Sequence, residues 1–304
     1  MNPFRKRAYI ELFIVAIIWG IAGPVIKITL GKIAPDLFIL YRFLISSVIA
    51  LIFFAFKGIK FPKDKITLIQ FFAYCFLNSS VSLGLLFWGT SKTSLIDMSL
   101  ISFFGPLLLA TAGYFFLKDT ITKREKTGTI IAFLGALIIG ISPLIGTVKG
   151  DGSLLGNLLI FLSLVSMAIS GVLSKKIMRK DVSPSLMANF SFIVGFITVF
   201  SFVLINKGIN YSLSPILNIK WEVWLGILYM AIVSGNIAYI LNNKGQKSIE
   251  LSEAAPFAYL HPIFSAIIAV VFLADKLTLP IIIGSLITFI GVLLAEWKKR
   301  GYNS

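Results

Sequence analysis

The sequence contains a single cysteine, a single histidine and few charged residues. Cys75 alone excludes an internal disulfide and a thiolate metal cluster, and in its apolar stretch we expect it to pack as a small hydrophobic side chain. The chain has no G-x4-G-K-[ST] phosphate-binding motif and no polar region large enough for a nucleotide-binding domain. It also lacks the clustered acids and histidine-rich motifs of most hydrolases and transferases. We therefore expect no cofactor and no bound metal.

Charged residues make up 13% of the chain and hydrophobic residues 57%, with a mean hydropathy of +0.93. Soluble proteins carry about 25% charged residues, so we expect this chain to lie in lipid. The apolar blocks of about 20 residues can cross a hydrocarbon core of about 30 Å as helices, and they lack the alternation of outer-membrane strands. We predict an all-α integral membrane protein with ten transmembrane helices, approximately at 9–30, 37–56, 67–90, 95–117, 126–145, 153–174, 185–205, 222–243, 251–273 and 278–297.

The formal charge of +15 is spread over short clusters of lysine and arginine between the apolar blocks. Because these clusters form no single basic face, they indicate membrane topology and not nucleic-acid binding. Arg5-Lys6-Arg7 precede an apolar run that is too long for a secretory signal and has no small-residue cleavage site, which predicts an uncleaved first helix. The charge distribution predicts an inner or plasma membrane protein with both termini in the cytoplasm.

Two distant segments of the chain repeat each other. Residues 100–138 align without gaps on residues 256–294, with matched proline, aspartate, threonine and glycine residues: Pro106 with Pro262, Asp119 with Asp275, Thr122 with Thr278, Gly128 with Gly284 and Gly135 with Gly291. We predict two five-helix repeats, 1–148 and 149–304. An odd number of helices inverts the second repeat, and four basic residues become apolar in the second copy: Lys118, Lys123, Arg124 and Lys126. Inverted repeats are typical of secondary transporters, with the site near the membrane midplane between them.

The opening segment and the repeated motif also point to a known family. The opening reads IIWGIAGPVIKITLGKIAPDLFILYRF (17–43), and both repeats carry apolar-Pro-apolar-Phe-Leu-x-Asp-x-x-Thr followed by two glycines. Over nearly its whole length the chain resembles the EamA-type branch of the drug/metabolite transporter superfamily, although the family usually has glutamate in place of Asp119 and Asp275. The resemblance implies an inverted 5+5 bundle whose third, fourth, eighth and ninth helices line a central cavity. It also implies transport, often outward, of amino acids, nucleosides, other small metabolites or drugs, with no catalytic residue.

His261 is expected about halfway along the ninth helix, next to Pro262. Proline lacks the N–H that would bond the carbonyl of Ala258, so Pro262, like Pro106 in the first repeat, predicts a helix kink with a free acceptor. The first repeat has no polar residue at the equivalent of His261. The imidazole is therefore a candidate to face the cavity and bind substrate or a coupling proton. The alternative is a neutral imidazole that bonds a nearby carbonyl.

Charged residues inside the apolar blocks are the next candidates. Asp97 and Glu253 occupy equivalent positions near the starts of the fourth and ninth helices, where they either cap those helices or act as gating or ion-coupling carboxylates. Lys27 either extends to the interface or takes part in gating. Arg42 lies deeper in its helix, and we expect it to face the cavity and bind substrate or to pair with Asp36 or Asp97.

Amides and aromatic rings complete the predicted substrate site. Asn78 and Asn236 either bind substrate or link helices by hydrogen bonds. The stacking wall would be formed by aromatic residues of the third, fourth, eighth and ninth helices: Trp88, Phe103, Phe104, Tyr239, Phe257 and Tyr259. Structural roles are expected for Asp119 and Asp275, as caps of the fifth and tenth helices, and for the glycines seven residues apart in each repeat, as close-packing positions.

The leading functional hypothesis is a secondary transporter that exports small metabolites such as amino acids. Without an ATP-binding signature, its energy must come from an ion or substrate gradient, and a coupling proton is one candidate. A flippase for lipids or lipid-linked sugars is the main alternative, and a membrane-embedded transferase is less favoured, so we do not expect an enzyme. The expected partners are a small-molecule substrate and membrane lipids, with no nucleic acid, for a monomer or homodimer.

Overall fold

The computed structural model describes residues 3–93, 95–141, 153–213, 216, 218–273 and 279–296. Every regular element in these ranges is a helix. The elements are α1 (Pro3–Leu30), α2 (Pro35–Lys57), α3 (Lys65–Cys75), η1 (Phe76–Leu83), α4 (Gly84–Lys92), α5 (Leu95–Ser102), α6 (Phe104–Ala112), η2 (Gly113–Leu117), α7 (Lys123–Ile141), α8 (Leu154–Met178), α9 (Pro184–Lys207), α10 (Ile209–Leu213), α11 (Trp221–Leu228), η4 (Tyr229–Ile237), α12 (Ala238–Ser248), α13 (Leu251–Ala254), η5 (Ala255–Leu260), α14 (His261–Leu273) and α15 (Leu279–Glu296).

Proline and glycine set the ends of the long helices. Both α2 and α9 begin with proline, Pro35 and Pro184, whose missing N–H costs nothing in the first turn. Ser183 caps α9 by accepting a hydrogen bond from the backbone N–H of residue 186. Gly58 and Gly208 end these helices with φ of +70° and +78°, which residues with a side chain rarely adopt. Local sequence therefore determines these two helices.

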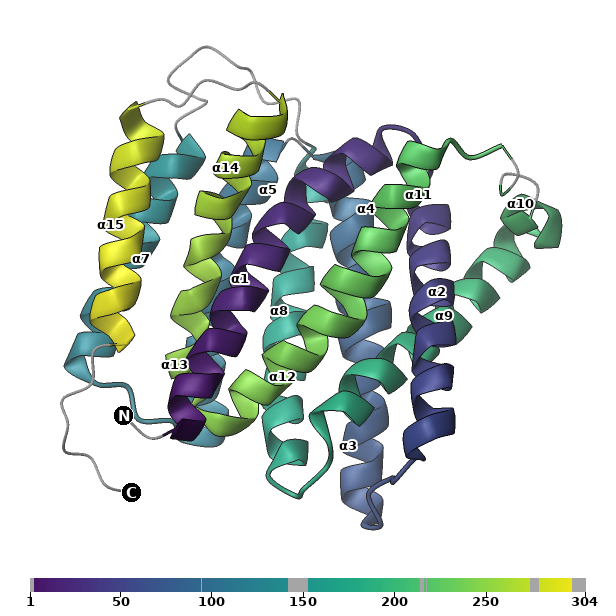
Figure 1. The fold of residues 1–304 in the computed structure, drawn as a ribbon, viewed down its shortest axis with the longest axis horizontal. Helices are drawn as coiled ribbons and strands as arrows, with labels where there is room; N and C mark the ends of the chain where they lie inside the picture. Colours follow the sequence, from purple (N-terminus) through teal and green to yellow (C-terminus); the bar gives the residue numbers. More distant parts are fainter. Residues whose placement is uncertain are drawn as a thin grey trace.

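Six helical runs among the described residues are long and apolar enough to cross a membrane: Pro3–Leu30, Pro35–Lys57, Lys65–Lys92, Leu154–Met178, Pro184–Lys207 and Trp221–Ser248. Two shorter apolar helices are Phe104–Leu117 and Ile282–Ala295. Figure 1 shows these helices running side by side in one bundle, with α7 and α15 at one edge and α2 and α9 toward the other. The chain is a helical membrane protein, as its composition predicts.

The α7–α15 pair packs through its glycines. A Cβ atom at Gly135 would lie 2.4 Å from the backbone nitrogen of Thr288, and one at Gly128 would lie 2.3 Å from the nitrogen of Ala295. Gly284 and Gly291 meet the α7 backbone equally closely from the other side. The two backbones approach to a distance that only glycine allows, which confirms the predicted close packing.

Several helices are less regular than the sequence predicts. The long third and eighth apolar blocks contain π-helical segments, η1 and η4, in their middles. The region expected to be a loop at 206–221 contains the short helix α10, so that expectation is wrong in part. A 3-10 segment, η5, directly precedes His261 and Pro262, and the N–H of His261 bonds the carbonyl of Ala258. That carbonyl is therefore not left free by the proline, because the tighter turn supplies another donor.

Candidate functional site

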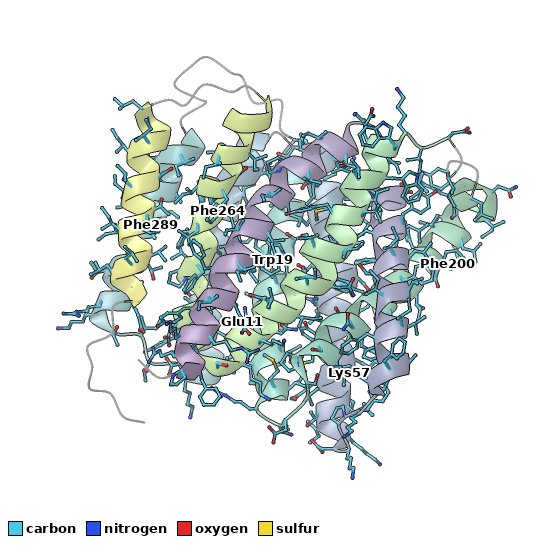
Figure 2. The ribbon with its side chains drawn as sticks, in the orientation of Figure 1. Glu11, Trp19, Lys57, Phe200, Phe264 and Phe289 are labelled. Carbon is cyan, nitrogen blue, oxygen red and sulfur yellow. The ribbon has the colours of Figure 1, made fainter. Side chains whose placement is uncertain are left out.

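A cavity of about 70 Å³ lies among α1, α3, η1, α6, α8, α12, α13, η5 and α14. Its polar and aromatic lining comes from both halves of the chain: Trp19, Tyr74, Asn78, Ser170, Ser174, Tyr239, Asn242, Asn243, Gln246, Phe257 and His261. Figure 2 shows Trp19 near the middle of α1. The volume admits a few water molecules, whereas small-molecule pockets measure roughly 300 Å³ or more. The cavity is therefore too small here for such a ligand, and we call this state of the cavity its contracted form.

His261 borders the cavity as the first residue of α14. The indole of Trp19 stands edge-on to the imidazole, with ring centroids 6.1 Å apart. The imidazole makes no hydrogen bond to the residues that the structure describes. The structure thus brings the histidine to the cavity, and it does not show the carbonyl-bonded arrangement that is the alternative.

The two predicted asparagines have different surroundings. Asn78 lines the cavity and donates to the hydroxyl of Ser191 at 3.4 Å. Asn236 is buried away from the cavity lining, where its amide donates to the carbonyl of Ser46 at 3.2 Å and to Oδ1 of Asn189 at 2.7 Å. Asn78 therefore borders the cavity, whereas Asn236 links three helices away from it.

Most of the predicted aromatic wall lies elsewhere. Tyr239 borders the cavity, with its ring centroid 5.2 Å from that of Trp19. Trp88 instead packs edge-on against Phe202 of α9, away from the cavity lining. Phe103 and Tyr259 are buried in the apolar core beside α1 and α7, and the Tyr259 hydroxyl has no hydrogen-bond partner among the described residues: Phe103 is 3% exposed and Tyr259 0%. Helix rotation, which composition does not reveal, separates these residues from Tyr239.

Arg42 is fully buried and does not form the predicted ion pairs. Its guanidinium lies 5.4 Å from the ring centroid of Phe87 and interacts with the hydroxyl of Tyr239. The carboxylate of Asp36 accepts hydrogen bonds from Lys207 at 2.6 Å and from a tyrosine hydroxyl at 3.1 Å. No ion pair joins Arg42 to Asp36 or Asp97 within the described chain, because the α9 lysine takes the nearer carboxylate at the helix end.

Glu253 and Asp97 make equivalent contacts at opposite ends of the bundle. Glu253, in α13, accepts hydrogen bonds from Nε of Arg5 at 2.7 Å and from the hydroxyl of Tyr9 at 2.5 Å. Asp97, in α5, accepts a hydrogen bond from the amide of Asn157 at 3.5 Å. In Figure 1 α13 lies at the lower end of the bundle and α5 at the upper end. Each carboxylate thus joins the start of a helix from the other half of the chain.

Two lysines, the buried Lys175 and the half-buried Lys27, bind backbone carbonyls near the same ends. Lys27 of α1 donates to the carbonyls of Thr90 and Thr93 at 3.2 and 2.8 Å. Lys175 of α8 donates to the carbonyls of Gln246, Lys247 and Ile249 at 2.5, 3.0 and 2.7 Å. Both ammonium groups satisfy the unpaired carbonyls at a helix C-terminus. Lys27 therefore does not simply extend into solvent.

Asp119 caps a helix other than the one predicted. Its carboxylate accepts hydrogen bonds from the backbone N–H groups of Leu251 and Ser252, at the start of α13. The fifth-helix position, α7, is instead capped by Thr122 and Glu125, each of which bonds the backbone N–H of the other. Sequence adjacency suggested α7, whereas tertiary packing brings α13 to Asp119. Asp275 and Thr278 lie outside the described residues.

Sequence reasoning missed several cavity residues. Trp19 belongs to the family-like opening but was not a predicted site residue, and Tyr74 and Gln246 were not singled out. A signal was present in the polar run Asn242-Asn243-Lys244-Gly245-Gln246, which interrupts an otherwise apolar helix. Polar side chains at membrane depth face a cavity or another helix, so such a run marks the inner face.

The bundle, the cavity between its halves and the buried charges at both ends define a membrane transporter. Models of the EamA-like transporter family match residues 6–141 and 154–297, and the chain belongs to this family. It is 28% identical over 294 residues to the "Uncharacterized transporter YyaM" of Bacillus subtilis, covering 96% of this chain and 94% of that protein. It is 24% identical over 305 residues to a "Probable amino-acid metabolite efflux pump" of Salmonella typhimurium, covering 97% and 96%.

A solved crystal structure shows the same fold. It shares 14% sequence identity with this chain and matches it with a TM-score of 0.77, over 95% of this chain and 96% of the other. The likeness extends along almost the full length of both chains. At this identity it establishes the arrangement of the helices alone.

Proposed function

We propose that this protein is a secondary transporter that exports small metabolites, such as amino acids or related compounds, by alternating access. The cavity enclosed by α1, α8, α12 and η5 carries the proposal, because helices from both halves of the chain build it. Its contracted volume suits a state between inward and outward opening. The efflux activity named for the Salmonella relative supports the direction and the substrate class.

In the proposed mechanism, two inverted repeats of five helices each, about 1–148 and 149–304, move against each other. The matched contacts support this arrangement. When the alignment of 100–138 with 256–294 is extended backwards without gaps, Thr90 and Thr93 correspond to Gln246 and Ile249, the carbonyls that bind Lys27 and Lys175. The same extension pairs Asp97 with Glu253, and equal spacings relate their partners Asn157 and Tyr9 to the two lysines. Equivalent contacts at opposite ends are what an inverted duplication produces.

The end contacts act as gates in this mechanism. At the α13 end, Glu253 joins α13 to the start of α1 through Arg5 and Tyr9. At the α5 end, Asp97 joins α5 to the start of α8 through Asn157. Rocking of one repeat against the other would break one set of contacts while the other holds. A carboxylate that must release its partners to open the gate is also a site where a proton can couple to transport.

The lower end of the bundle in Figure 1, where α1 begins, faces the cytoplasm in this proposal. The basic residues Arg5, Lys6 and Arg7 lie there, as do Lys175 and Lys176 at the end of α8. The preference of positive charge for the cytoplasmic side supports this orientation, in which both termini of the proposed inner or plasma membrane protein would lie in the cytoplasm.

Counterflow in proteoliposomes tests the proposal. Vesicles containing the purified protein are loaded with pooled unlabelled amino acids or nucleosides, and uptake of labelled compound is measured without an ion gradient. Uptake above that of protein-free vesicles is expected. His261→Ala should lose it if the imidazole binds the substrate, and retained exchange would assign His261 to the scaffold. No exchange with any pool, together with a lipid that copurifies, would favour a flippase, and turnover of that lipid would favour a transferase.

A further inference from the structure

A buried polar cluster lies behind the cavity wall, where α2 and α9 meet the helix formed by η4 and α12. Five residues make up this cluster, Ser46 through its backbone carbonyl: Arg42, Ser46, Asn189, Asn236 and Tyr239. Each is less than 9% exposed, and the surrounding residues are the apolar core that includes Phe38, Phe43, Phe87 and Phe192. Ionisable groups at membrane depth are costly, so an arginine there requires a compensating function.

The guanidinium of Arg42 is incompletely satisfied. Its Nε and Nη1 atoms have no hydrogen-bond partner among the described residues, although Arg42 is only 1% exposed. The rings of Phe43 and Phe87 lie 5.9 and 5.4 Å away and stabilise the charge, but they do not fill these two N–H positions. No carboxylate of the described chain forms an ion pair with it. The site therefore suits an anion that the described part of the chain does not supply.

An unfilled acceptor accompanies these donors. Nδ2 of Asn236 donates to the carbonyl of Ser46 and to Asn189. A backbone carbonyl can only accept, so this contact fixes the orientation of the amide. Oδ1 of Asn236 then points away from both partners and has no hydrogen-bond partner in the part of the chain that the structure describes. A buried amide oxygen without a donor is a place for an ammonium group.

The two unfilled groups are neighbours across one helix interface. Ser46 follows Arg42 by one turn of α2, and Asn236 precedes Tyr239 by about one turn of the facing helix. Ser46 contacts Asn236, and Arg42 interacts with Tyr239, so the two pairs of residues lie about one helical turn apart along the interface. One group that binds an anion and a neighbouring group that binds a cation suit a zwitterionic ligand.

We propose that Arg42 and Asn236 form the subsite that binds the carboxylate and ammonium groups of a zwitterionic α-amino acid. Tyr239 closes this subsite in the contracted form, because its side chain borders the cavity and interacts with Arg42 at the same time. Its ring rests edge-on against Trp19 and Phe192, at 5.2 and 5.3 Å, and rotation of this ring opens the subsite to the cavity. The inference rests on the proposed transport function and specifies its substrate class.

The test compares matched analogues in counterflow with the wild-type protein. L-leucine is compared with L-leucinamide, isopentylamine and 4-methylpentanoic acid, and L-phenylalanine with L-phenylalaninamide, phenethylamine and 3-phenylpropanoic acid. The amide lacks the carboxylate charge, the amine lacks the carboxylate and the acid lacks the ammonium group. The side chain is the same in all of them. We expect each analogue to compete at least about tenfold more weakly than its amino acid, since a hydrogen bond to a charged group is lost.

Variants assign this preference to the two residues. Arg42→Gln should remove the preference for the acid over the amide, Arg42→Lys should weaken it, and Asn236→Leu should remove the preference for the ammonium group. Arg7→Gln is the matched control, because the Arg7 side chain is 72% exposed and pairs only along its own helix. Size-exclusion profiles and Tm verify folding, and the wild-type comparison stands by itself if a variant does not fold.

The outcomes distinguish failure of the subsite assignment from failure of the proposed transport function. If wild-type protein exchanges amides and amines as well as amino acids, or if Arg42→Gln keeps the preference for the acid, the subsite assignment is overturned while the transport function stands. If wild-type protein exchanges none of the pooled compounds, the proposed function fails and the subsite fails with it. Preference for the amino acid that is lost in Arg42→Gln and kept in Arg7→Gln supports both.

Discussion

Lys27 and Lys175 make the same contact in different halves of the molecule. Lys27 of α1 binds carbonyls that end and follow α4, and Lys175 of α8 binds carbonyls that end and follow α12. Each ammonium group thereby joins the first helix of one half to the C-terminus of the third helix of the same half. Four unpaired carbonyls at a buried helix end would otherwise face lipid or core.

Replacing Lys175 should destabilise the protein far more than replacing its neighbour. Lys175→Met removes three hydrogen bonds made by a lysine that is 6% exposed, and we expect a loss of about 2–3 kcal/mol and a lower Tm. Lys176→Met is the control, because Lys176 is exposed on the same turn. Thermal unfolding of both purified variants in detergent measures the effect, and equal Tm values would show that the carbonyls find other donors.

Glu253→Gln should open the α13 end of the bundle. The change removes the ion pair with Arg5, which is partly exposed, so we expect a cost of about 1 kcal/mol and an approximately fivefold larger open population. A Cys75→Ser, Ser174→Cys background places one thiol at the cavity, and its rate of reaction with a charged maleimide reports opening. Arg7→Gln leaves this contact intact and should label at the wild-type rate. An unchanged rate in Glu253→Gln would remove this residue from the gate.

Gly135→Ala should loosen the α7–α15 pair. A new Cβ would lie 2.4 Å from the nitrogen of Thr288, so the backbones must separate, at a cost of about 1–3 kcal/mol. Gly23→Ala is the matched helical control, since its Cβ would meet nothing closer than a methionine Cε at 4.0 Å. Chemical or thermal unfolding should rank the two variants in this order. The reverse order would mean that the close approach does not persist in solution.

Asp64 should make stability depend on acid pH. The hydroxyl of Thr67, the ammonium group of Lys180 and the backbone N–H of Thr67 hold the pKa of this exposed carboxyl well below its usual range. Because the folded-state pKa is depressed, the stabilisation is present above the unfolded value of about 4 and is lost as the pH falls toward the folded value. The Tm difference between wild type and Asp64→Ala should be constant from about pH 5 to 8 and shrink below about pH 4. A difference that does not change with pH would show that charge is unimportant here.

Helix ends were predictable where the signal is local. Proline at the first position and glycine after the last determine α2 and α9 through backbone sterics alone. Thr122 and Glu125 show the limit of such reasoning: their capping box is local, but the carboxylate of Asp119 reaches α13, more than a hundred residues away. A carboxylate caps whichever helix start packs against it, and sequence order does not contain that information.

The candidate site was predictable only in part. His261, Asn78 and Tyr239 reach the cavity, whereas Trp88 and Tyr259 turn away from it by rotation about their helices. In an apolar helix nearly every face is hydrophobic, so the pattern does not show which face is inside. The π-helical segments η1 and η4 shift the rotation further and leave no clear mark in composition.

The sequence by itself determined that this chain is a helical membrane protein, that two of its segments repeat and that a few charges lie within apolar blocks. Hydropathy, proline and glycine act locally or through composition, so their effects do not depend on tertiary contacts. Tertiary structure alone decided that Asp36 pairs with Lys207, that Lys27 and Lys175 bind helix ends, and that Arg42 is left without an anion behind Tyr239. Each of these contacts joins residues that are far apart in the sequence. Many other pairings are possible, and the packing of the helices determines which pairs are in contact.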